Sequence, residues 1–125
     1  MTENDIKEII NGDTQKMVEE AEKKGEQLKE EGLTTSQIRN IFCAVKQMEM
    51  KGFDEKKLKL LKPKLAYAAA RPGAKEGTIK LKNILTFAID VVGDDEKKFE
   101  NFCNFFEAIL AYHRAAHENK EVFRQ

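Results

Sequence analysis

Apolar side chains recur at helical spacing in this chain, and the longest such stripe runs from residue 99 to residue 113. Its members are Phe99, Phe102, Cys103, Phe106, Ile109, Leu110 and His113. Steps of three and four residues relate these positions, so they lie on one face of an α-helix. No segment shows the strict alternation that is typical of a half-buried strand. The pattern predicts an all-α fold with this helix at the centre of the core.

Capping and helix-breaking residues divide the rest of the chain into further helices. Thr34 and Gln37 form a T-x-x-Q capping box at the start of one helix, and Gly52 ends it. Asp54 is the expected N-cap of the next helix. In chain order, we expect helices over 5–30, 34–52, 54–70 and 78–92 and from Asp94 onward, with a connector over 71–77.

Two expected helices contain residues that interrupt helical structure. Asn11 and Gly12 can break the first helix. Pro63 lies inside the third, where it either kinks the helix or begins a new one in its first turn. The expected architecture is a compact single-domain bundle of about five helices over residues 1–125. Its ends are an acidic helical segment over 1–31 and a tail over 115–125 that can fray.

Composition narrows the class of protein. The chain has 125 residues, of which 41% are apolar and 35% are charged, a balance that favours a folded helical protein over a disordered one. No apolar run approaches the roughly 20 residues that span a bilayer, and the N-terminus is acidic, unlike an export signal. We therefore expect a cytoplasmic protein without a membrane partner. Cys43 and Cys103 both lie at apolar helical positions, which favours buried reduced thiols over a disulfide.

The zero net charge conceals an uneven distribution of charge along the sequence. Residues 1–31 contain 10 acids and 5 bases, whereas residues 56–82 contain 9 bases and a single acid, Glu76. Residues 83–110 reverse the sign again, with 6 acids and 2 bases. A polyanionic partner is therefore expected to approach the middle of the chain.

The alanine-rich stretch LKPKLAYAAARPG, at 61–73, carries Lys62, Lys64, Tyr67 and Arg71 and no carboxylate. Because a helix advances 100° per residue, the last three form a row beside the apolar stripe, and the row spans ~10 Å. Such a row can contact two successive phosphates of a nucleic-acid strand, with Tyr67 against a base or sugar. The alternative is a solvated lysine face with Tyr67 covering the core.

Basic groups also recur near the ends of two other expected helices. Arg39 follows the capping box, and Arg114 closes the most apolar helix. Both positions are ones that a partner could reach.

The residues give no positive reason to expect an enzyme. His113 and His117 stand four apart, the spacing of a zinc-binding pair, but Arg114 replaces the glutamate of the H-E-x-x-H motif. The positive charge of Arg114 would repel a metal ion bound to the two histidines. We therefore expect no metal site, no cofactor and no catalytic residues. The alternative is a small metal-dependent hydrolase that uses the two histidines.

Three segments together carry a family resemblance. They are LTTSQIRNIF at 33–42, LKPKLAYAAAR at 61–71 and FCNFFEAILAYHR at 102–114. In this order they resemble the small helical subunit of the type III-A CRISPR-Cas effector, the Csm complex, over a core at 33–114. Two positions depart from that family: Ala70 stands where the family usually has Gly, and Arg114 stands where Lys is frequent.

The resemblance implies a non-catalytic RNA-binding subunit that acts in antiviral defence. Copies of such a subunit line up beside the backbone subunits and contact the guide RNA and its paired target RNA. RNA cleavage belongs to the backbone subunit, whereas DNA cleavage and cyclic oligoadenylate synthesis belong to the large subunit. Carried over by position, the implied RNA contacts are Arg39, Lys64, Arg71 and Arg114.

Two alternatives to a type III-A subunit keep the helical fold. The small subunit of a type III-B CRISPR complex is also a small helical bundle. A helical adaptor that docks an acidic protein would need the same basic side chains.

Overall fold

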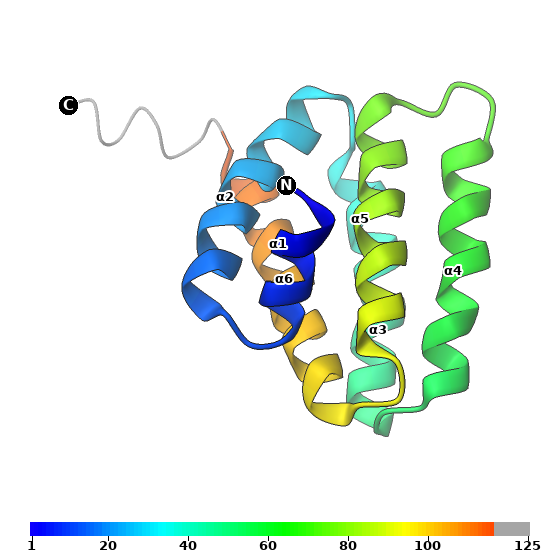
Figure 1. Cartoon of the computed structure of the whole chain (residues 1–125). Helices are drawn as coiled ribbons and strands as arrows, with labels where there is room; N and C mark the ends of the chain where they lie inside the picture. Colours follow the sequence, from blue (N-terminus) through cyan, green and yellow to red (C-terminus); the bar gives the residue numbers. More distant parts are fainter. Residues whose placement is uncertain (117–125) are drawn as a thin grey trace.

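The computed structural model describes residues 1–116, which form six α-helices (Figure 1). They are α1 (Glu3–Ile10), α2 (Thr14–Glu30), α3 (Thr35–Lys51), α4 (Glu55–Ala70), α5 (Glu76–Val92) and α6 (Glu96–Ala115). No strand occurs in this part of the chain, so the all-α prediction is confirmed. The first expected helix is divided into α1 and α2, and the interruption lies at Asn11 and Gly12, where the sequence predicted it.

The predicted capping residues hold the starts of α3 and α4. The Thr34 hydroxyl accepts a hydrogen bond from the Gln37 amide at 3.1 Å, and the Gln37 side chain accepts one from the Thr34 amide at 3.0 Å. The Asp54 carboxylate accepts from the Lys57 amide at 3.2 Å. The N-cap of α6 is Asp95, one residue after the expected Asp94.

At Pro63 the structure excludes one of the two alternatives, because α4 continues through this residue and no new helix begins there. The start of the next helix differs from the expectation. Helix α5 begins at Glu76, which places Gly77 in its first turn and not in a connector. The Gly77 amide donates a hydrogen bond to the carbonyl oxygen of Glu31 at 2.9 Å, and this bond ties the start of α5 to the end of α2.

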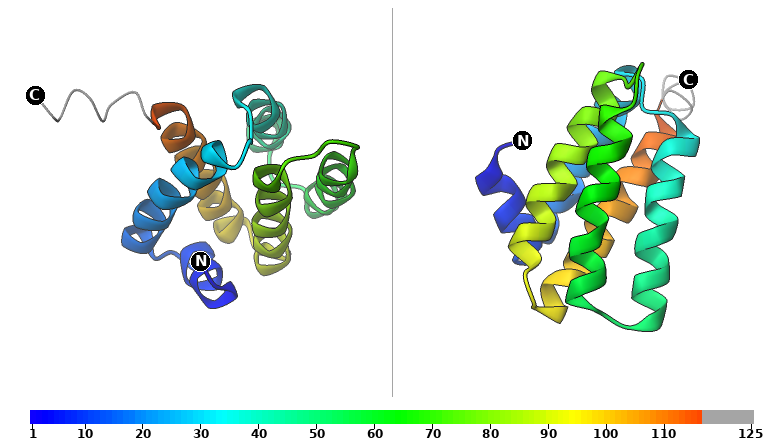
Figure 2. Two further views of the ribbon diagram at one scale, coloured as in Figure 1. Left: turned by 90° about the horizontal axis from the view of Figure 1, so that it is seen from above. Right: turned by 90° about the vertical axis from the view of Figure 1, so that its right-hand side faces the viewer.

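Helix α6 occupies the middle of the bundle and packs against α1, α2, α3 and α5 (Figures 1 and 2). Helix α4 lies at the edge, beside α5 and on the side of the molecule opposite α2. The core is continuous, and its largest fully buried side chains include Phe102, Phe105, Phe106, Ile9, Ile10, Leu28, Leu58 and Leu81. Among the described residues, none of the helices is long and apolar enough to cross a membrane.

The prediction that the 99–113 stripe forms the centre of the core is confirmed. Phe102 and Phe106 have no exposed surface, and Phe42 of α3 packs edge-on against Phe106 with ring centroids 5.4 Å apart. The prediction for the cysteines is half right. Both are free thiols, and Cys103 is buried. Cys43 is exposed because it follows Phe42 by one residue, and the 100° step of the helix turns its side chain away from the core.

His113 is a core residue with no exposed surface. Its Nε2 lies 2.6 Å from the carbonyl oxygen of Leu33. A carbonyl only accepts, so Nε2 carries the hydrogen and donates it. The other ring nitrogen, Nδ1, is buried and has no hydrogen-bond partner within residues 1–116. Burial lowers the pKa of His113, the nearby Lys29 charge lowers it further, and the bond to Leu33 opposes this shift.

The lowered pKa of His113 predicts a pH-dependent stability. Below about pH 6.5 the unfolded chain binds a proton at this residue more readily than the folded chain does. The stabilising contribution is therefore complete above that pH and is lost as the pH falls below it. Urea unfolding between pH 7.5 and 5 should show a declining free energy of unfolding.

The matched variant is His113→Gln, which cannot titrate and keeps a donor for the Leu33 carbonyl. Its stability should change less than that of the natural chain over the same pH range. The hydrogen bonds from Thr2 and Lys16 lower the pKa of Asp5 to about 2, so the stability that Asp5 contributes is lost only at pH values below this range. Equal pH dependence in the two proteins would contradict the assignment to His113.

Candidate nucleic-acid interface

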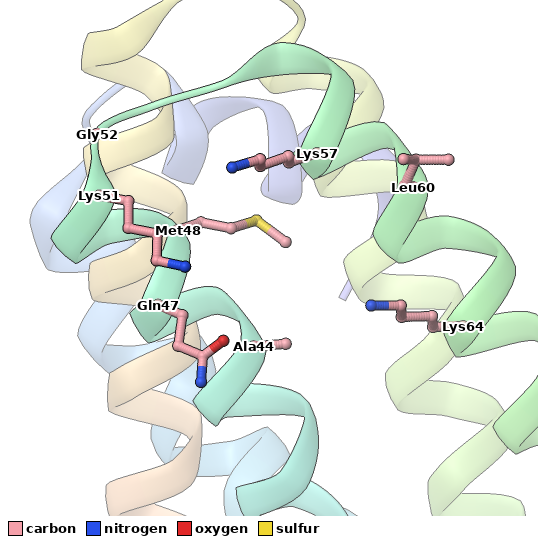
Figure 3. A pocket seen from close by; sticks show the side chains of 8 residues that line it. All are labelled: Ala44, Gln47, Met48, Lys51, Gly52, Lys57, Leu60 and Lys64. Atoms are coloured by element: carbon pink, nitrogen blue, oxygen red, sulfur yellow. The ribbon is translucent and has the colours of Figure 1, made fainter.

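Two hollows lie between α3 and α4. The first, of about 250 Å³, is lined by Ala44, Gln47, Met48, Lys51, Gly52, Lys57, Leu60 and Lys64 (Figure 3). The second, of about 290 Å³, is lined by Gln37, Asn40, Ile41, Ala68, Arg71, Pro72, Gly73, Ala74 and Thr78. Among the described residues, no acidic side chain lines either hollow. We call these two hollows together the α3–α4 groove.

The groove exists because α3 and α4 are held by different neighbours. Helix α4 buries Leu58, Leu61 and Leu65, and Lys62 forms an ion pair with Asp90 of α5, with Nζ and Oδ1 2.5 Å apart. Helix α3 packs chiefly on α6. Within residues 1–116, no side-chain hydrogen bond or ion pair joins α3 to α4. Small side chains at Ala44 and Ala68 leave the space between the two helices unfilled.

Cationic side chains follow the α4 wall of this groove at regular intervals. Lys57, Lys64 and Arg71 are exposed and seven residues apart, which places them on one stripe with about 10 Å between successive members. Beside this row stand Leu60, 52% exposed, and Tyr67, 74% exposed. Such a surface suits a single strand of nucleic acid. The cations can contact its phosphates, and the apolar side chains can contact its sugars and bases.

The structure brings some of the sequence-predicted residues together and separates others. Lys64 and Arg71 line the two ends of the groove, and Tyr67 projects into solvent beside them. Lys62 points to the other flank of α4 and is paired on α5. Arg39 of α3 and Arg114 of α6 are exposed but line neither hollow.

Sequence reasoning missed two cations of the groove. Lys57 continues the seven-residue spacing of Lys64 and Arg71, so the helical period could have revealed it. Lys51 lies at the end of α3, and only the packing of α3 beside α4 places it opposite Lys57 and Lys64.

Several other lysines are neutralised locally, in contrast to those of the groove. Lys46 pairs with Glu49 at 3.0 Å and Lys59 with Glu55 at 2.7 Å, and hydrogen bonds to these carboxylates raise the pKa of both lysines. Within the described part of the chain, no ion pair involves Lys51, Lys57, Lys64 or Arg71. The positive charge of the groove is therefore available to an anionic partner.

The side chains that the sequence offered for chemistry are the histidine pair and the cysteine thiols. No group of three His, Cys, Asp or Glu side chains in residues 1–116 could hold a metal ion, and His117, the second histidine of the possible zinc pair, lies outside those residues. Burial raises the pKa of the Cys103 thiol to about 12, so it is not a ready nucleophile. What the groove offers is a binding surface for anions.

Comparison with known proteins identifies the family of the chain. The model of the family described as Csm2 Type III-A matches residues 11–119, which is most of the sequence. Comparisons with individual curated proteins and with solved structures gave no match. The match covers all three segments that carried the resemblance, and it selects type III-A over the type III-B alternative. The chain therefore belongs to the Csm2 family, the small subunit of type III-A CRISPR-Cas effector complexes.

Proposed function

We propose that this subunit binds RNA through the α3–α4 groove and takes no catalytic part in RNA cleavage. The observation that carries the proposal is the row of Lys57, Lys64 and Arg71, which have no ion pair in the described chain and face a groove without an acidic lining residue. Lysine and arginine side chains neutralise phosphates irrespective of base sequence. The groove therefore suits a subunit that supports RNA along its length without reading bases.

The partners in this proposal are the guide RNA and the target RNA, within a cytoplasmic effector complex. Membership of a Csm complex implies contacts with other subunits, and we propose that further copies of this chain are among them. Arg39 and Arg114 then serve as contacts outside the groove. A few cations on one copy give limited affinity, whereas several copies on one strand bind with far greater avidity.

Replacing Lys64 and Arg71 by alanine should flatten the salt dependence of RNA binding. Each lost phosphate contact on a single strand lowers the slope of log affinity against log salt by ~0.7, so the double variant should lose about 1.4. Fluorescence anisotropy of a labelled single-stranded RNA, measured from low to moderate salt, gives this slope. The measurement applies both to the free subunit and to the assembled complex.

A matched control removes two positive charges from a surface outside the groove. Lys7 and Lys23 are exposed on α1 and α2, outside the groove, so Lys7→Ala with Lys23→Ala should leave the slope unchanged. The labelled RNA should stay intact in all incubations, with or without divalent metal. If the folded Lys64→Ala, Arg71→Ala variant keeps the natural RNA affinity and salt slope in both settings, then Lys64 and Arg71 are solvated side chains that do not contact RNA. The groove would then not be the RNA site.

A further inference from the structure

Three lysines from two helices converge on the first hollow of the α3–α4 groove. Lys57 and Lys64 extend from α4 toward α3, and Lys51 lines the hollow from the α3 side, with its ammonium near Gln47 and Met48 (Figure 3). The side-chain amide of Gln47 lies at the same hollow and adds a neutral hydrogen-bond donor. The second hollow contains a single cation, Arg71, so the two ends of the groove differ in charge.

The apposition of these lysines is unfavourable in the protein alone. Like charges that face one another repel, and no carboxylate of the described chain lines this hollow to compensate them. The nearby acids are engaged elsewhere: Glu49 pairs with Lys46, Glu55 pairs with Lys59, and Asp54 caps the start of α4. A doubly charged oxyanion between the lysines would remove the repulsion and accept hydrogen bonds from both helices.

We propose that this hollow is a phosphate site formed by Lys51, Lys57, Lys64 and Gln47, and that the bound phosphate clamps α4 to α3. The site rests on the proposed RNA contact and deepens it by naming where one phosphate is held most strongly. Because no side-chain hydrogen bond or ion pair joins α3 to α4 within residues 1–116, the phosphate supplies the missing link between them. Binding at this hollow therefore stabilises the folded chain, because the hollow exists only where α3 and α4 lie side by side.

Thermal unfolding of the full chain tests the site with inorganic phosphate as the probe. At a phosphate concentration about five times its dissociation constant, the midpoint should rise by roughly 3–6 °C above that in sodium chloride of equal ionic strength. Lys57→Gln with Lys64→Gln should abolish this rise. Lys56→Gln, which removes an exposed charge next to Lys57 but outside this hollow, should retain it.

A second arm separates free phosphate from the phosphates of RNA. A short single-stranded RNA should raise the midpoint in the same Lys57- and Lys64-dependent manner, and an uncharged-backbone analogue of the same sequence should not. Arg71→Ala should weaken RNA binding while leaving the effect of inorganic phosphate intact, because Arg71 lines the other hollow.

The outcomes distinguish this site from the proposed function. Equal phosphate-induced rises in the natural chain and in the Lys57→Gln, Lys64→Gln variant would overturn the phosphate site, even if RNA still binds elsewhere in the groove. A phosphate-specific rise without measurable RNA binding to the subunit or the complex would retain the site and overturn the proposed function. If free phosphate raises the unfolding midpoint and RNA does not, the site accepts only small anions. This result would contradict the proposal that a phosphate of RNA links α4 to α3.

Discussion

Replacing Phe106 by alanine should destabilise the protein by about 3–5 kcal/mol, one of the largest effects expected of a single substitution in this chain. Phe106 has no exposed surface and contacts the rings of Phe42 and Phe102. The substitution removes the transfer free energy of the ring and leaves a cavity between α3 and α6, which the packed helices can close only in part. Urea or thermal unfolding measures the loss, which corresponds to roughly 10–20 °C in the midpoint.

Met50 provides the control for this prediction. It is also a large apolar residue on a helix, but it is 79% exposed, so Met50→Ala should change the free energy of unfolding by no more than about 0.5 kcal/mol. A loss below about 1 kcal/mol for Phe106→Ala would place that ring outside the core. The described packing of α3 against α6 through the rings of Phe42 and Phe106 would then be wrong.

The helices were predictable because the signals that form them are local. The capping box at Thr34 and the N-cap at Asp54 act over three or four residues, and the stripe that contains Phe102 and Phe106 needs only the helical period. The break at Asn11 was likewise visible in the sequence. The capping box of Thr2 and Asp5, which begins α1, is a local signal that was missed.

The candidate site was predictable only in part, because its shape depends on which helices meet. The row of Lys64 and Arg71 follows from their positions on one helix. Lys62 is two residues from Lys64 and therefore about 200° around the helix, so it faces α5 and pairs with Asp90. Lys51 joins the groove only because α3 lies beside α4, and nothing in the local sequence encodes that apposition.

Gly25 is a second residue whose role appears only in the packed structure. It is buried where α2 crosses α6, and a Cβ added there would lie 2.7 Å from the backbone nitrogen of His113 and 2.7 Å from the Cβ of Tyr112. Alanine normally favours a helix interior over glycine by up to about 1 kcal/mol. Here the contact is with the backbone of a neighbouring helix, which cannot rotate away, so the steric cost exceeds that gain.

Gly25→Ala should therefore destabilise the protein by about 2 kcal/mol, and Gly25→Val by more, measured by urea unfolding. Lys23→Ala, at an exposed position of the same helix, is the control and should change stability by no more than about 0.5 kcal/mol. Moving α6 away from α2 also displaces His113 from the Leu33 carbonyl, so the pH dependence of stability should weaken in the Gly25 variants. A more stable Gly25→Ala protein would show that the two helices separate without cost, and that their close approach does not hold His113 in place.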